Sequence, residues 1–328
     1  MKKLASLVLV LALATPLAAP HPAEAALDAA KYMDAVAKGD DEVLQDIFAG
    51  PDREQAIAYH DSEGRSPLDH AFLHATPLQA YDAVLLLIRT GMEPGAGKRS
   101  PGLALIEQLA CDELSQRIDP AALNETLPSG LTPFHWACAL AVPQTLKRLI
   151  DAGADLSEAG AGGRGPADNA LIMAAARTRY AEVVDLLLKK GLDPESTSAS
   201  GMGAPAVACL FNELPDVALA LIQTGANVKR EDAVSGTPFQ YVAGHAYALP
   251  LLKQLASRGA DVFASDDAGF TAPHEAARSN PSPEVIKMLI DRGGDLRQRD
   301  GNGRTAFEGL PAERKAWLKD AGLGRYLR

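Results

Sequence analysis

A short phrase that recurs at a nearly constant period constrains the fold of this chain more than any other feature. Aliphatic residues, one or two polar residues and a glycine follow one another in the same order through the second half of the chain. The copies are LIDAGAD, LLKKGLD, LIQTGAN, LASRGAD and MLIDRGGD, with glycines at Gly153, Gly191, Gly225, Gly259 and Gly293. The successive spacings of these glycines are therefore 38, 34, 34 and 34. A fixed period of this length predicts an array of supersecondary units, each of which packs on its neighbours.

A second phrase precedes each of these glycines. Its copies are TPFHWACA, ALIMAAA, APAVACL, TPFQYVAG and TAPHEAAR, which begin at residues 132, 170, 204, 237 and 271. Thr is a good helix N-cap and Pro suits the first helical turn, whereas the later glycine is a helix stop signal. The residues between the two phrases are enough for two short antiparallel helices. The Asp-, Ser- and Gly-rich residues after each glycine cannot continue a helix and suit an extended β-turn.

These phrases resemble the ankyrin repeat. GLTPFH at residues 130–135 and GAD at 153–155 are similar to the G-x-T-P-L-H and G-A-D/N motifs of that family. The resemblance is specific from about residue 130 to 307, and weaker copies lie upstream. It implies an all-α ankyrin-repeat solenoid of about eight stacked helix-turn-helix units with β-turn finger loops. It also implies recognition of protein partners as a class, without indicating which protein.

The repeat is less regular before residue 130. GRSPLD from Gly64 followed by LLLIRTGME is a recognisable copy, residues 28–52 lack the Thr-Pro phrase, and residues 96–129 are the least regular. We therefore divide the chain into a signal peptide (1–25), an opening ankyrin-like repeat (26–63), divergent repeats (64–129), regular repeats (130–307) and a C-terminal capping helix (308–328).

The segment 1–25 has the pattern of a secretory signal peptide. Lys2 and Lys3 precede an apolar run, and Ala23-Glu24-Ala25 offers small residues for cleavage after Ala25. The apolar run is too short for a transmembrane helix, and no later segment approaches the required length. The short Lys-Lys start is typical of bacteria, so we expect the mature chain in the periplasm, or as a second choice in the medium, without membrane insertion.

Net charge and cysteines exclude several classes of function. The formal net charge is −10, which disfavours nucleic acid and anionic lipid as partners. Cys111, Cys138 and Cys209 form no C-x-x-C pair, so neither a zinc ribbon nor a redox dithiol is predicted. We expect small buried thiols. A bridge between Cys111 and Cys138 stays open from the sequence.

Glycine-rich and histidine-containing segments are the candidates for sites of chemistry. GAGGRG at residues 160–165 fits G-x-G-x-x-G, but no βαβ unit surrounds it, so an enlarged finger loop is the preferred interpretation. His135 and His274 hold the fourth position of the Thr-Pro phrase, where the family uses histidine to stabilise the turn. His70 and His74, four residues apart, could contribute to a metal site but lack a clear third ligand. No G-x-S-x-G or H-E-x-x-H motif is present. The sequence predicts no cofactor, no bound metal and no enzyme.

We number each unit from the Thr of its second phrase. Positions 5, 8 or 9, and 11 are expected to face outward on the concave side. Aromatic residues, only 5% of the chain, are concentrated there. The candidate partner-binding residues are Trp136, Arg177, Tyr180, Phe211, Asn212, Tyr241, His245, Tyr247, Glu275 and Arg278. Aromatic and arginine side chains are enriched at interface hot spots. The alternative is that Trp136 and Phe211 lie in the core between repeats, or that insertions shift the register of the Tyr241 unit.

The sequence therefore predicts a monomeric, non-catalytic module that binds a protein partner of unknown identity on a pre-formed concave surface. Two alternatives stay open: an immunity protein that neutralises a toxin delivered to the periplasm, and a metal-dependent enzyme that uses His70 and His74.

Overall fold

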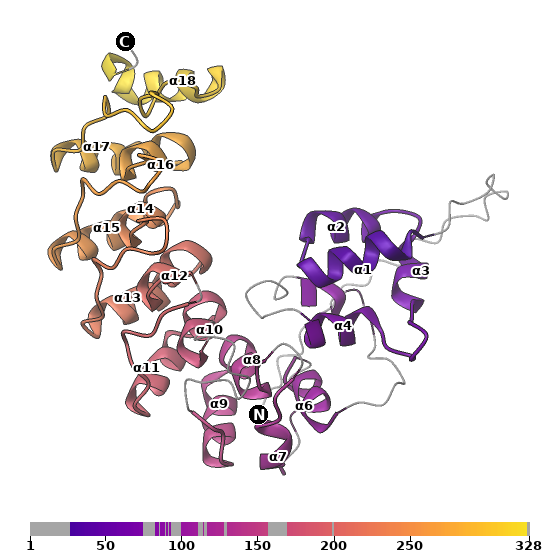
Figure 1. Ribbon diagram of the computed structural model, residues 1–328. Coiled ribbons are helices and arrows are strands. Elements are labelled where there is room, and N and C mark those ends of the chain that lie inside the picture. The colour runs from indigo at the N-terminus through magenta and orange to yellow at the C-terminus, as the bar shows by residue number, and fades with distance from the viewer. Residues whose placement is uncertain are drawn as a thin grey trace, which may run out of the picture.

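The computed structural model describes residues 27–74, 83–84, 86–88, 90, 92, 100–110, 114, 117–127, 130–156, 169–198 and 200–326. All regular structure in these ranges is helical, apart from two isolated β-bridges, Thr197 with Gly203 and Ser265 with Thr271. Figure 1 shows the helices stacked in successive layers. The predicted all-α stack of helix pairs is confirmed.

The regular part of the stack consists of two columns of helices, which Figure 1 shows side by side. The inner column is α8 (Pro133–Leu140), α10 (Ala170–Arg177), α12 (Ala204–Phe211), α14 (Pro238–Ala243) and α16 (Ala272–Ser279). The outer column is α9 (Pro143–Asp151), α11 (Ala181–Lys189), α13 (Pro215–Gln223), α15 (Ala248–Ser257) and α17 (Pro283–Asp291). Each inner helix contacts the next inner helix, and each outer helix contacts the next outer helix.

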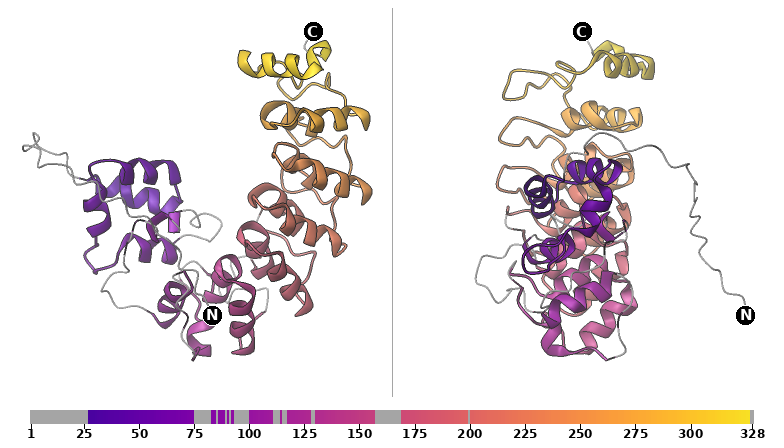
Figure 2. Two further views of the ribbon diagram at one scale, coloured as in Figure 1. Left: turned by 180° about the vertical axis from the view of Figure 1, so that it is seen from behind. Right: turned by 90° about the vertical axis from the view of Figure 1, so that its right-hand side faces the viewer.

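The two ends of the chain complete the stack differently. The amino-terminal block is α1 (Ala29–Lys38), α2 (Asp41–Ala49), α3 (Arg53–Ala58) and α4 (Pro67–His74), followed by α6 (Pro101–Ala110) and α7 (Pro120–Leu123). The carboxyl end is α18 (Ala312–Leu318), followed by the helical turns Lys319–Leu323 and Gly324–Tyr326. In Figure 2 the block of α1–α4 stands apart from the column of α10–α17. In the described parts of the chain, no helix has the length and hydropathy to cross a bilayer.

In the copies that start at Ser66, Thr132, Thr237 and Thr271, the fourth residue accepts a hydrogen bond from the backbone N–H of the first, which gives the capping box that begins α4, α8, α14 and α16. The same bond at Thr305 lies in a turn before α18. Chemically different side chains make this bond. The pairs are Asp69 with Ser66 (2.7 Å), His135 with Thr132 (3.2 Å), Gln240 with Thr237 (2.8 Å), His274 with Thr271 (3.3 Å) and Glu308 with Thr305 (2.9 Å). The structural role expected for His135 and His274 is confirmed. Burial lowers the pKa of His135 to about 4, so its neutral Nδ1 can accept the bond.

The recurring glycines end the outer helices. Gly153, Gly191, Gly225, Gly259 and Gly293 all have φ between 81° and 98°. Glycine adopts this left-handed conformation without steric cost, which explains why the chain can turn at the same point in every unit.

Finger loops connect each outer helix to the next inner helix, and Figure 2 (right) shows them projecting along one side of the stack. Backbone hydrogen bonds join neighbouring finger tips in the same register. They run from Ala233 N to Ser200 O (2.9 Å), from Asp267 N to Val234 O (3.0 Å) and from Gly301 N to Ala268 O (2.7 Å). The fingers are therefore held relative to one another as well as to their own helices.

The buried side chains form two hydrophobic clusters. The main cluster runs through the stack from α6 to the carboxyl end, and the amino-terminal cluster includes Tyr32, Phe72 and Leu103. Cys138 and Cys209 are buried free thiols in the main cluster, as expected. Burial raises the pKa of the Cys209 thiol to about 12, so it is protonated at neutral pH.

Four predictions concern residues or side chains that the structure does not describe. The signal peptide at 1–25, the glycine-rich segment at 160–165, Cys111 and the side chain of His74 all belong to this group.

Candidate protein-interaction surface

The candidate residues gather where the inner helices end. We call the turns between inner and outer helices the turn edge, which comprises residues 141–142, 178–180, 212–214, 244–247 and 280–282. Because paired helices run antiparallel, this edge lies at the opposite end of the helices from the fingers. The structure brings Arg177, Tyr180, Phe211, His245 and Arg278 to this edge or to the last turn before it.

Asn212 holds adjacent repeats together and is not available at the surface. Its Nδ2 group donates to Ala175 O and Thr178 O, both at 3.0 Å, and the residue is only 5% exposed. The last carbonyls of an α-helix lack partners within the helix, so a side chain from the next repeat supplies the donor. The exposure predicted for Asn212 is therefore wrong.

A side chain from the following unit also donates to carbonyls at the ends of α14 and α16. Asn280 Nδ2 donates to Ala243 O and His245 O, both at 2.7 Å. Arg314 of the capping helix closes the end of α16, where its guanidinium donates to Ala277 O (2.8 Å) and Ala276 O (3.1 Å). These bonds make the turn edge a pre-formed surface.

Trp136 is also buried, contrary to the predicted exposure. Its accessible surface is 0%, and it belongs to the amino-terminal cluster. The indole Nε1 has no hydrogen-bond partner in the described part of the chain. The alternative that placed this residue in the core between repeats is correct, because residues of the irregular amino-terminal part cover it.

His245 and Tyr247 lie in the turn between α14 and α15 and are half-buried against the end of α12. Their rings stack with centroids 5.1 Å apart and planes at 12°, and the Tyr247 hydroxyl donates to Asn212 O. Burial lowers the pKa of His245 and raises the pKa of Tyr247 to about 12. Only part of each ring is therefore available to a partner.

Tyr241 points to the base of a finger. Its half-buried hydroxyl donates to the Asp232 carboxylate, and burial together with this bond raises the pKa of Tyr241.

His70 stands at the same position of an earlier repeat and contacts Asp61 at 2.9 Å, next to Arg65. This finger contact accounts for His70 without a metal. In the ranges that the structure describes, no group of three or more His, Cys, Asp or Glu side chains could hold a metal ion.

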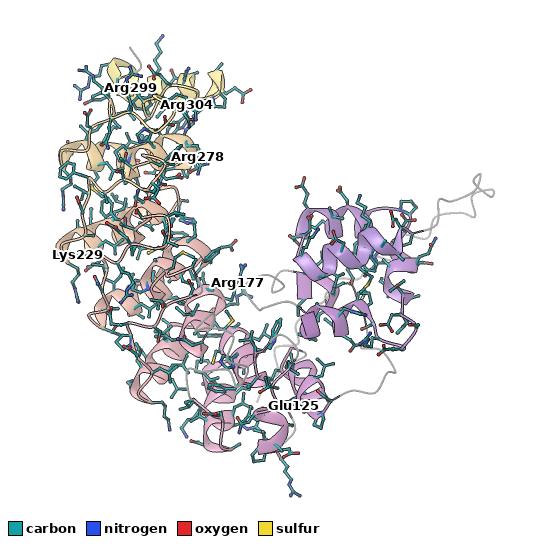
Figure 3. All side chains as sticks on the ribbon, in the orientation of Figure 1. Glu125, Arg177, Lys229, Arg278, Arg299 and Arg304 are labelled. Atoms are coloured by element: carbon teal, nitrogen blue, oxygen red, sulfur yellow. The ribbon has the colours of Figure 1, made fainter. Side chains whose placement is uncertain are left out.

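Five of the candidate residues keep exposed or half-exposed side chains near the turn edge: Arg177, Tyr180, Phe211, Glu275 and Arg278. Tyr180 is 37% exposed, and Arg278 forms an ion pair with Glu275 at 2.7 Å. In Figure 3, Arg177 and Arg278 lie along the same side of the stack, and Lys229 lies on the opposite side. Surface residues from three repeats, those of α10, α12 and α16, thus form one row along the turn edge.

Sequence reasoning missed Leu214, which is 39% exposed at the turn edge. Leu214 and Tyr180 are the N-cap residues of α13 and α11, and neither side chain makes a capping hydrogen bond. The signal was present in the sequence, because Leu214 stands one repeat period after Tyr180 and both precede an outer helix.

Comparisons with known proteins identify ankyrin repeats in part of this chain. Residues 102–198 match the family model of ankyrin repeats (3 copies). Ankyrin repeat and SOCS box protein 6 of Homo sapiens is 32% identical over 107 residues, which is 31% of this chain and 25% of that protein. Putative ankyrin repeat protein FPV031 of Fowlpox virus (strain NVSL) is 28% identical over 134 residues, or 40% of this chain and 39% of that protein. Palmitoyltransferase AKR1 of Lachancea kluyveri is 27% identical over 215 residues, or 61% of this chain and 28% of that protein.

This chain therefore spans less than half the length of each of these relatives. Two of these relatives are named ankyrin repeat proteins, and the third is named a palmitoyltransferase. Ankyrin repeats suggest protein partners. The period, the helix pairs and the matched segment together show that this chain contains ankyrin repeats and folds as an all-α ankyrin-repeat solenoid.

Proposed function

We propose that this protein is a monomeric, non-catalytic binding module of the bacterial periplasm that holds one partner protein on the concave side of its solenoid. The observation that carries the proposal is the row formed by exposed Tyr180, half-buried Phe211 and exposed Arg278, which lie in or beside the turns that follow α10, α12 and α16. Bonds from Asn212 and Asn280 hold this row in place before any partner arrives. A pre-formed surface loses little conformational entropy on binding, which favours affinity.

The experiment that tests this function begins with residues 26–328 produced in the periplasm. Proteins captured by it are identified, purified separately and mixed with it again. We expect one partner to form a stoichiometric complex whose dissociation constant can be measured by calorimetry. Failure of every captured protein to rebuild a complex from pure components would contradict the binding function.

A charge-swapped variant serves as the site control. Glu275→Arg combined with Arg278→Glu retains an oppositely charged pair three residues apart but reverses the charges shown to a partner. The folded variant is expected to bind the partner more weakly, with most of the loss at low ionic strength. If the captured partner is a toxin that the complex inactivates, the immunity role is the specific form of this function.

Export is the second part of the proposal, and the pattern of Lys2, Lys3 and the apolar run after them supports it. Expression of the full chain in a bacterium should yield a periplasmic product whose N-terminal residue is Ala26. An uncleaved product that stays in the cytoplasm would contradict export without affecting the binding function.

A further inference from the structure

We propose that the turn edge binds an amphipathic α-helix of the partner, with Tyr180 and Leu214 as its two apolar anchors. The inference rests on the proposed binding function and names the chemistry that this surface recognises. The proposed site is the turn edge, which lies at the opposite end of the helices from the finger loops.

Neither local helix stability nor core packing explains these two side chains. Ser, Thr, Asp and Asn are the favoured N-cap residues because their side chains accept a backbone N–H, which Tyr and Leu cannot do. Another outer helix, α17, has Ser282 at its N-cap, so this position does not require an apolar residue. Tyr180 and Leu214 are nevertheless 37% and 39% exposed. Residues that break a local rule without a packing gain are expected at functional sites.

The apolar positions continue on both sides of this pair. Val142 is the N-cap of α9 and Tyr247 is the N-cap of α15, and both are half-buried. Four successive outer helices thus begin with an apolar residue, of which the middle two are the most exposed. They form an apolar ridge that runs along the turn edge.

The spacing of this ridge matches a helix that lies along the solenoid axis. Outer helices α11 and α13 are in contact, and packed helices lie about 8–10 Å apart. Seven residues of an α-helix rise about 10.5 Å. A partner helix with an apolar residue at every seventh position can therefore place one on Tyr180 and the next on Leu214. An extended strand is disfavoured, because the described part of this chain offers no β-strand edge to pair with its backbone.

The charges beside the two anchors differ. Exposed Arg179 and Glu182 lie on either side of Tyr180, whereas Glu213 and Asp216 are both exposed beside Leu214. The surface is therefore acidic at Leu214 and of mixed charge at Tyr180, so a partner helix needs basic residues near the Leu214 anchor. This difference in charge fixes the direction in which the helix lies along the ridge.

The test uses a fluorescent designed peptide of three heptads, with leucine at every seventh position, acidic residues in one half and basic residues in the other. A second peptide has the same leucines with acidic residues in both halves. Fluorescence anisotropy measures the binding of each peptide to residues 26–328. We expect saturable binding of the first peptide, weaker binding of the all-acidic peptide, and a difference between the two that shrinks as salt is added.

The decisive variant is Tyr180→Ser combined with Leu214→Ser. It removes both anchors and places a favoured N-cap residue on each helix, so it is expected to fold and to melt no lower than the wild type. Peptide affinity should fall by about tenfold or more. The matched control is Val234→Ser combined with Phe263→Ser, which removes apolar side chains that are 56% and 55% exposed in the loops on the finger side. This control should retain the affinity of the wild type.

Three results would overturn the inference: no peptide binding by the wild type, equal affinity in the Tyr180→Ser, Leu214→Ser variant, or loss of affinity in the control alone. Retention of the purified partner by the Tyr180→Ser, Leu214→Ser variant would reject the turn edge and leave the binding function standing. Absence of any partner complex with the wild type would instead reject the binding function.

Discussion

The indole of Trp136 in α8 packs edge-on against the ring of Phe72 in α4, with ring centroids 5.1 Å apart and planes at 84°. Both side chains are fully buried. Trp136 belongs to the amino-terminal cluster, whereas its neighbours Phe134 and Ala137 belong to the main cluster. Helix α8 therefore joins the two hydrophobic cores of the molecule.

This burial predicts the fluorescence of a variant in which Trp136 is the single tryptophan. In Trp317→Phe, iodide should quench the remaining emission weakly, because the indole is shielded from solvent. In Trp136→Phe, the emission of half-buried Trp317 should be quenched more readily. Strong quenching in folded Trp317→Phe would show that α4 does not cover the indole in solution.

The capping histidine His135 predicts a pH-dependent stability. Its pKa is about 4 in the folded protein and 6.5 as the reference for the unfolded chain, so between these values the unfolded chain binds a proton that the folded chain does not. The free energy of unfolding should therefore fall as pH drops from 6.5 to 4, by about 3 kcal/mol from this residue. Urea unfolding followed by circular dichroism across this range measures the effect.

The substitution His135→Gln separates the titration from the cap. Gln240 makes the equivalent bond in another repeat, so glutamine should preserve the cap and reduce the pH dependence between 6.5 and 4. His135→Ala should lose about 1 kcal/mol above pH 6.5 because the cap is gone, and it should also lack the pH dependence that His135 contributes. An unchanged pH profile in His135→Gln would assign the dependence to other groups.

Removal of the bond between repeats at Asn212 should destabilise the stack. Asn212→Ala leaves the carbonyls of Ala175 and Thr178 without this donor, and we expect a loss of about 1–3 kcal/mol in urea unfolding. Gln144→Ala is the control, because Gln144 is exposed on α9 and its truncation should change stability by less than about 0.5 kcal/mol. Equal effects of the two substitutions would contradict the structural role of Asn212.

The finger residue Ser235 has a left-handed backbone with φ of 61°, where the equivalent residues of neighbouring repeats are Gly201, Gly269 and Gly303. Ser235→Gly should raise the free energy of unfolding by about 1 kcal/mol, because glycine adopts this conformation without steric cost. The reciprocal change Gly303→Ser should lower it by a similar amount, since a Cβ there meets no atom within 4 Å and only the backbone is strained. Thermal melts of both variants check the signs, and a loss of stability in Ser235→Gly would mean that its hydroxyl bond to Asp267 outweighs the strain.

The fold could be predicted because its signals are local. The Thr-Pro phrase specifies a helix start through bonds within four residues, as His135 with Thr132 shows. Glycines such as Gly191 specify the helix end through their own φ. Repetition of these signals at a fixed period then determines that helix pairs stack, since one pair alone cannot bury its apolar face.

The surface could be predicted only in part, because burial depends on neighbours far away in the sequence. Trp136, Tyr241 and Glu275 occupy the same register position in three repeats, yet Trp136 is buried under α4 and Tyr241 is tied to Asp232. Asn212 occupies a register position expected at the surface, but its amide bonds to carbonyls of the preceding repeat. The sequence by itself determined the helix pairs of the regular repeats and their stacking, because propensity, capping and periodicity act over a few residues. Only the tertiary structure decided which side chains of that register meet solvent, because their exposure depends on what the adjacent repeats place over them.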